Sequence, residues 1–86
     1  MARIIDSDRM NLIGSNVRKY RKALNMSQHD LSAKLELLGV YVCRGSVSRI
    51  EDYSRTVTDI ELYALATVLR TDIADLFECP PPRDLL

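Results

Sequence analysis

The sequence contains few of the residues that interrupt helices. Its 86 residues include three Gly, three Pro, no Trp, four Tyr and one Phe. Because chain breakers are scarce and 47% of the residues are hydrophobic, we expect one small all-α domain with a single core of Leu, Ile and Val. A chain of this length has little room for a second domain or an elaborate active site.

The sequence also contains few cysteines and histidines, which argues against a metal site and against an enzyme. Cys43 and Cys79 lie far apart without a second Cys or His at ligand spacing, so we expect two reduced thiols rather than a disulfide or a zinc site. The single histidine, His29, has no matching nucleophile, and the sequence has no glycine-rich phosphate loop. We therefore predict no metal, no cofactor and no enzymatic activity.

Long apolar runs are also missing. No run approaches the ~20 residues that cross a bilayer, and the start MARIIDSDRM has no apolar stretch long enough for a signal peptide. The sequence therefore predicts a cytoplasmic protein without a membrane segment.

Charge is balanced overall but divided unevenly along the chain. Residues 1–57 carry ten Lys and Arg against six Asp and Glu, a net charge of +4, whereas residues 58–86 carry two against six, a net charge of −4. This division is the pattern expected of a basic face that meets an anion, as in a protein that reads nucleic acid. Chance segregation of solvated charges is the alternative that the charge pattern alone leaves open.

Apolar residues recur at helical spacing in five segments, which predicts five short helices. The second helix has Asp30 at its third position, where a carboxylate meets free amides, and Gly39 is expected to end it. The expected caps of the second to fifth helices are Ser27, Cys43, Thr58 or Asp59, and Asp72. The apolar stripes are Ile13, Val17, Tyr20 and Leu24; Leu31, Leu35 and Leu38; Val47 and Ile50; Leu62, Leu65, Ala66 and Leu69; and Ile73, Leu76 and Phe77.

These helices predict a domain at residues 12–78, preceded by an N-terminal arm at residues 1–11 and followed by a tail at residues 79–86. The tail begins with Cys79 and three consecutive prolines, which end the last helix and favour polyproline II backbone. A ligand for a partner protein is the alternative reading of these prolines.

Three stretches of the sequence carry a family resemblance. They are IGSNVRKYRKALNMSQHDLSAKL, SVSRIED and IELYALATVLRTDIADLF, which together span about residues 12–77. In this order they resemble the helix-turn-helix DNA-binding domains of the phage repressor and Cro type, the XRE family. The resemblance implies a compact five-helix bundle of the lambda-repressor-like type, whose third helix enters the major groove of double-stranded DNA.

The resemblance implies DNA contacts for two groups of residues. Arg44 and Arg49 point in neighbouring directions on the third helix, and an arginine fork suits guanine O6 and N7. Gln28 lies in the first turn of the preceding helix, where free amides and the helix dipole face a phosphate. The predicted base-reading residues are Arg44, Gly45, Ser46, Ser48 and Arg49, and the predicted phosphate contacts are Gln28, Arg18, Lys19, Tyr53, Ser54, Arg55 and Thr56. For each of these residues, the alternative to a DNA contact is an exposed side chain that contacts only solvent.

The family match also sets Glu51 against Arg21 of the first helix. An acid that faced outward on a DNA-reading helix would repel phosphate, so Glu51 is expected to face inward. A bidentate pair with Arg21 would join the two helices and neutralise both charges. The implied role of this pair is structural.

The sequence departs from the family pattern at three places. The stretch ELLGVYV lengthens the segment between Gln28 and the third helix, which predicts either a second helix longer by about a turn or an enlarged turn between the second and third helices. Arg3 and Arg9 are alternative base readers if the third helix is tilted. Asp52-Tyr53 stands where the family commonly has Asn-Gly, so Asp52 is expected to adopt the left-handed conformation. Cys43 stands where a Ser or Thr cap is common, so this helix start is expected to depend on packing.

The resemblance implies a transcription regulator that binds two operator half-sites as a homodimer, because one recognition helix reads only a few base pairs. Repression by occlusion of promoter DNA is the expected mechanism. Ile73, Leu76 and Phe77 are the candidate dimer contacts, and closure of the monomer core is their alternative role. The alternative function is a protein-interaction module on the same fold, such as an antitoxin or a regulatory partner.

Overall fold

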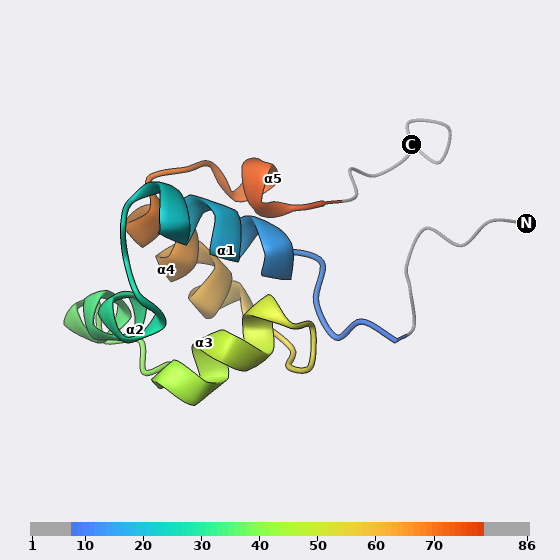
Figure 1. The fold of residues 1–86 in the computed structure, drawn as a ribbon, viewed down its shortest axis with the longest axis horizontal. Coiled ribbons are helices and arrows are strands. Elements are labelled where there is room, and N and C mark those ends of the chain that lie inside the picture. Colours follow the sequence, from blue (N-terminus) through green and yellow to red (C-terminus); the bar gives the residue numbers. More distant parts are fainter. Residues whose placement is uncertain (1–7, 79–86) are drawn as a thin grey trace, which may run out of the picture.

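The computed structural model describes residues 8–78 and folds them into five α-helices with no strand in that range (Figure 1). The helices are α1 (Gly14–Ala23), α2 (Gln28–Leu37), α3 (Arg44–Glu51), α4 (Asp59–Leu69) and α5 (Ile73–Leu76). This confirms the all-α, five-helix architecture. The predictions made for Arg3, Cys79 and the prolines at 80–82 concern residues outside the described range.

One hydrophobic core lies among the helices. In Figure 1, α3 lies below α1 and α5 above it, and α3 packs against both α1 and α2 while α5 packs on α1 and α4. The core residues are Ile13, Val17, Met26, Leu31, Leu35, Val42, Val47, Ile50, Ala64, Leu65, Ala66, Leu69 and Leu76. Burial of these side chains is the main force that fixes the helices relative to one another.

The last members of the apolar stripes predicted for the first two helices are exposed and lie outside the core. Leu24 and Leu38 are the C-caps of α1 and α2, and both side chains are exposed. The expectation that Leu38 lines the buried side of α2 was therefore wrong. The backbone leaves the helical path at a C-cap, so the 3.6-residue period no longer decides where that side chain points.

Both ends of α2 are fixed by local hydrogen bonds. Ser27 Oγ accepts from the Asp30 amide at 3.0 Å and the Asp30 carboxylate accepts from the Ser27 amide at 2.9 Å, which completes a capping box. At the other end Gly39 takes φ +78°, and the amides of Gly39 and Val40 donate to Glu36 O and Leu35 O. The predicted start and stop of this helix are thus confirmed.

The connection between α2 and α3 comprises six residues, 38–43, whereas an ordinary helix-turn-helix uses three or four. This is the enlarged turn that the sequence predicts. Val42 is fully inside the core and Val40 packs against it, so the turn is anchored by apolar contacts. Tyr41 between them points outward.

The exit from α3 differs from the prediction. Asp52 is the C-cap with φ −100°, and Tyr53 is the residue that adopts the left-handed conformation, with φ +67°. The amides of Tyr53 and Ser54 donate to Ile50 O and Arg49 O, and this bonding pattern requires the left-handed residue one position after the C-cap. The expectation of a left-handed Asp52 was wrong for this reason.

Candidate nucleic-acid interface

The first turn of α3 presents its surface to solvent. Val47 and Ile50 point into the core, while Arg44, Gly45 and Arg49 are exposed. Arg44 forms no hydrogen bond or ion pair with the part of the chain that the structure describes. A Cβ built on Gly45 would meet no atom within 4 Å, so the protein's own packing does not require glycine there. This turn therefore has both charge and room for a partner.

Ser46 and Ser48 lie differently from each other. Ser46 is only 9% exposed, and its Oγ accepts from Arg49 Nη2 at 3.1 Å and from Cys43 Sγ at 3.4 Å. The buried Ser46 hydroxyl is thus engaged inside the protein by Arg49 and Cys43, whereas the sequence predicted that it would read a base edge. Ser48 is half-buried and lies beside Gln28.

The start of α3 lacks a side-chain cap. Cys43 adopts the extended backbone of an N-cap but makes no side-chain hydrogen bond to the helix amides. Its exposed thiol instead contacts Ser46 Oγ. In the thiolate form the sulfur can instead accept from the Ser46 hydroxyl and from the amides of Ser46 and Gly45, and these donors together with the charge of Arg49 lower the pKa of Cys43.

Arg21 and Glu51 form a bidentate ion pair between α1 and α3. Arg21 Nε lies 2.7 Å from Glu51 Oε2 and Arg21 Nη2 lies 3.0 Å from Glu51 Oε1. The two side chains are 8% and 5% exposed, and Arg21 Nη1 donates to Met26 O at 2.8 Å. The hydrogen bond to Glu51 raises the pKa of Arg21 above its ordinary value. The pair lies where the family resemblance implies it.

A small polar hollow of about 200 Å³ lies above this ion pair. It is lined by residues of α1, α2 and α3 and by the C-cap of α3, namely Arg18, Arg21, Gln28, Ser48, Glu51 and Asp52. Gln28 Nε2 also donates to Glu51 Oε1 at 3.3 Å. The structure thus brings Arg18, Gln28 and Ser48 together. Lys19 lies elsewhere, because its ammonium is 5.5 Å from the centre of the Tyr20 ring, and Tyr20 faces α4 and the start of α5.

The loop after α3 uses most of its polar groups internally. Arg55 makes a bidentate pair with Glu61 of α4, at 2.7 and 3.0 Å, and this contact raises the pKa of Arg55 and lowers that of Glu61. Ser54 Oγ donates to Asp52 Oδ1. Thr56 is exposed, and its carbonyl accepts from Arg55. The Arg55 charge is therefore already neutralised by Glu61, and a phosphate contact at Arg55 would compete with this ion pair.

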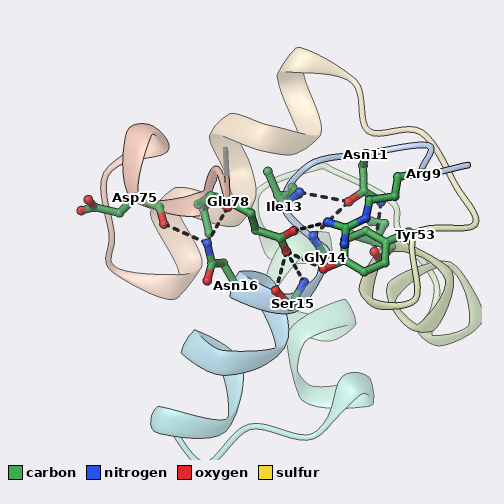
Figure 2. A network of polar contacts seen from close by, with 11 residues as sticks. Arg9, Asn11, Ile13, Gly14, Ser15, Asn16, Tyr53, Asp75 and Glu78 are labelled. Atoms are coloured by element: carbon green, nitrogen blue, oxygen red, sulfur yellow. Dashed lines mark hydrogen bonds and ion pairs between the residues drawn. The ribbon is translucent and has the colours of Figure 1, made fainter. Parts of the chain in front are cut away.

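Tyr53 belongs to a polar cluster around Glu78 (Figure 2). Tyr53 Oη donates to Glu78 Oε1 at 2.7 Å, the Ser15 amide donates to the same oxygen at 2.8 Å, and Ser15 Oγ contacts it as well. Arg9 Nη1 donates to Glu78 Oε2 at 3.0 Å and lies over the Tyr53 ring. The Tyr53 hydroxyl is thus turned toward Glu78, which differs from the predicted phosphate contact.

Asn11 and Gly14 also contact the backbone at the C-terminal end of α3. Asn11 Nδ2 donates to Ile50 O at 3.0 Å and to Arg55 O at 2.9 Å, while its Oδ1 accepts from the amides of Ile13 and Gly14. A Cβ on Gly14 would lie 2.5 Å from Ile50 O, so only glycine permits this approach of α1 to α3. Sequence reasoning missed Asn11 and Glu78, since neither lies on an apolar stripe.

The candidate dimer residues divide into two kinds. Leu76 is fully buried and closes the monomer core, which is its alternative role, whereas Ile73 and Phe77 are each 38% exposed. Ile73 adjoins an apolar hollow of about 670 Å³ that is also lined by Leu38, Val40, Ile60, Leu62 and Tyr63. Ile60 and Tyr63 are each 68% exposed, so α4 presents a considerable apolar surface.

No helix within residues 8–78 combines the length and apolarity needed to cross a membrane. The same residues contain no cluster of three or more His, Cys, Asp or Glu side chains suited to hold a metal ion.

Comparisons with known proteins agree with this geometry. A search of curated proteins gives no match to the chain. Among solved structures, the restriction-modification controller protein C.AhdI from Aeromonas hydrophila is similar, with a TM-score of 0.65 and 29% sequence identity over 76% of this chain and 87% of that chain. A family described as Helix-turn-helix matches residues 17–76, which include α2, the enlarged turn and α3. The chain therefore belongs to the helix-turn-helix family of the phage repressor and Cro type.

Proposed function

We propose that this protein is a sequence-specific double-stranded-DNA-binding regulator of transcription that represses by binding two operator half-sites as a homodimer. The family assignment and the controller-protein neighbour support a DNA-binding transcription regulator. The observation that carries the proposal is the first turn of α3, where Arg44 is exposed without a partner in the described chain and Gly45 is open. A helix with such a turn fits the major groove, and arginine suits the guanine edge.

The neighbouring helices supply the expected phosphate contacts. Gln28 begins α2, so its amide and the helix dipole favour an anion, and Arg18 lies beside it across the polar hollow. The Arg21–Glu51 pair fixes α3 against α1 directly below this hollow. In this arrangement α1 and α2 hold the phosphate backbone while α3 meets the bases.

Pairing of two copies would place two α3 helices on successive turns of DNA. Ile73 and Phe77 remain candidates for the contact, and the apolar hollow beside Ile73 adds Ile60 and Tyr63 of α4. A twofold interface uses the same surface on both subunits. Bound to a promoter in this way, the dimer would exclude the transcription machinery.

Selection of bound sites from random duplex DNA, followed by titrations at several salt concentrations, tests the proposal. Wild type is expected to enrich a motif with two related halves, and its affinity should fall steeply with salt. Arg44→Ala and Arg49→Ala should each cost roughly 1–3 kcal/mol on that site and relax the preference for one base in each half. Loss of a phosphate contact, as in Arg18→Ala, should weaken all sequences alike. Absence of duplex binding would exclude the function.

Gly45→Ala tests whether the glycine at this position serves folding or DNA binding. Because a Cβ at Gly45 is unobstructed and alanine favours a helix, the variant should be as stable as wild type or up to ~1 kcal/mol more stable. If the helix approaches DNA closely, the same variant should bind its site more weakly. Equal affinity of both proteins would show that α3 does not approach DNA at Gly45.

A protein-interaction module is the second candidate function. It is favoured by the exposed apolar side chains at the end of α2, in the enlarged turn and on α4, which are Leu37, Leu38, Tyr41, Ile60 and Tyr63. An interaction module of this kind would bind its partner with little dependence on salt and would not enrich a duplex motif, so the same selection distinguishes the two functions.

A further inference from the structure

The hydroxyl of Ser46 contacts a side chain that the proposed function places at the DNA. Arg49 Nη2 donates to Ser46 Oγ at 3.1 Å, and Ser46 is 9% exposed while Arg49 is exposed. The two residues are three positions apart on α3, a spacing that puts their side chains on one side of the helix. A buried oxygen thus holds one end of an exposed guanidinium.

The restraint leaves the rest of the guanidinium available. A guanidinium has five N–H donors in a planar fork, and Ser46 is the acceptor of one Nη2 donor. A bidentate contact to guanine needs a fixed fork direction, and an unrestrained arginine loses considerable rotamer freedom when it binds. A hydroxyl anchored in the protein therefore supplies part of that order before DNA arrives.

Arg44 provides the contrast within the same helix. It is also exposed, but it has no hydrogen-bond or ion-pair partner in residues 8–78. The two arginines that face the partner are consequently ordered to different degrees in the free protein. Arg49 would therefore meet a base with part of its side-chain order already in place, whereas Arg44 would lose all of that freedom on binding.

We propose that Ser46 is a positioning residue that orients the Arg49 guanidinium and thereby sets the base preference at one position of each half-site. This inference rests on the proposed function of the protein. Ser46 itself does not touch the DNA. Its hydroxyl acts through Arg49, and the contact from Cys43 Sγ at 3.4 Å fixes the same oxygen from the start of the helix.

Ser46→Ala, Arg49→Ala and the double variant test the inference when each is titrated against duplexes that differ at one base pair. Ser46→Ala is expected to lower discrimination at the Arg49 position by about two- to tenfold, the range expected when one side chain loses its prior ordering. Its binding to unrelated duplex and its salt dependence should stay at the wild-type level. In the Arg49→Ala background the Ser46 change should add no further loss of discrimination, whereas a purely structural role would add one.

Ser32→Ala on α2 is the matched control, because Ser32 is a partly buried helix serine remote from Arg49 in the sequence. It should leave discrimination unchanged. Thermal unfolding of every variant verifies that it is folded. Unaltered discrimination in folded Ser46→Ala would overturn the inference.

A second measurement does not need DNA. Side-chain ¹⁵N relaxation of free wild type should show the Arg49 Nε more ordered than the Arg44 Nε, and Ser46→Ala should bring Arg49 to the level of Arg44. Equal mobility of Arg49 in both proteins would overturn the positioning role even if duplex binding were demonstrated. Failure of wild type to bind any duplex, with Arg49 ordered by Ser46, would instead remove the proposed function and with it the base-preference part of the inference.

Discussion

The two ends of α3 are held in opposite ways. At its N-terminal end Cys43 offers no cap, Arg44 has no partner in the described chain, and Gly45 is open to solvent. At its C-terminal end Glu51 is paired with Arg21, and the Ile50 carbonyl accepts from Asn11. The protein therefore holds α3 mainly by its C-terminal end, and leaves its first turn available for the proposed ligand.

This difference assigns stability and recognition to separate ends of one short helix. Groups that are buried or paired at the C-terminal end contribute to the free energy of unfolding. Groups at the N-terminal end are left unsatisfied or exposed in the free protein, and these are the groups that the proposed DNA contact would use. Substitutions at the two ends should consequently affect different measurements.

The largest effect is expected at the buried ion pair. Glu51→Ala leaves the Arg21 charge without its partner in a site where both side chains are nearly inaccessible, so the unfolding free energy should fall by about 3–5 kcal/mol. Urea unfolding measures this loss. Glu36→Ala, which removes an exposed acid from α2, is the control and should change stability by less than ~0.5 kcal/mol. A loss below ~1 kcal/mol in Glu51→Ala would place the pair among ordinary surface pairs.

The close approach of α1 to α3 should give the next largest effect. Gly14→Ala places a Cβ 2.5 Å from the Ile50 carbonyl oxygen, which forces a backbone shift and should cost about 1–3 kcal/mol. Gly45→Ala is the matched control, since the same change at the open end of α3 should cost nothing. Similar melting temperatures for the two variants would show that the two ends are not held differently.

A cap introduced at the free end should give a smaller change of opposite sign. Cys43 already has the backbone of an N-cap, with φ −67° and ψ 164°, so Cys43→Ser should supply the missing acceptor and raise the unfolding free energy by up to ~1 kcal/mol. Cys43→Ala, which adds no acceptor, should leave stability nearly unchanged. Equal stability of Cys43→Ser and Cys43→Ala in urea would contradict the expected cap.

The smallest effect concerns pH. Burial opposes ionisation of Glu78, but the hydrogen bonds from Ser15 and Tyr53, together with the charge of Arg9, lower its pKa below the ordinary 4.5. A lowered folded-state pKa means that the ionised carboxylate stabilises the fold above pH 4.5, and that this contribution is lost as pH falls through the folded-state pKa. The stability difference between wild type and Glu78→Gln should therefore be constant near neutral pH and shrink in acid. A difference that does not depend on pH would show that the Glu78 charge contributes no stability.

Local rules predicted the helices well because their signals lie within a few residues of one another. The capping box of Ser27 and Asp30 and the stop at Gly39 involve neighbours in the sequence, and the stripe of Val47 and Ile50 follows the helical period. The Arg21–Glu51 contact spans 30 residues, and only the family resemblance pointed to it.

Other features depended on tertiary contacts that no short pattern encodes. Ser46 was expected at the DNA, although its position four residues before buried Ile50 already placed it on the inner face. Arg55 was assigned to phosphate, but Glu61 lies within its reach in the first turn of the next helix. Tyr53 took the conformation usually given to glycine because its hydroxyl, its ring and its carbonyl all have partners in the surrounding structure.

The Glu78 cluster also has a consequence for the order in which the molecule folds. Its contacts join Glu78 to Tyr53, Ser15 and Arg9 across 25, 63 and 69 residues, whereas α2 and α3 are near neighbours in the chain. Contacts that close long loops form late, since their entropy cost is met only after other elements have come together. We therefore expect the left-handed turn at Tyr53 to be secured last, and a chain still being synthesised to fluctuate at this turn until residue 78 has been added.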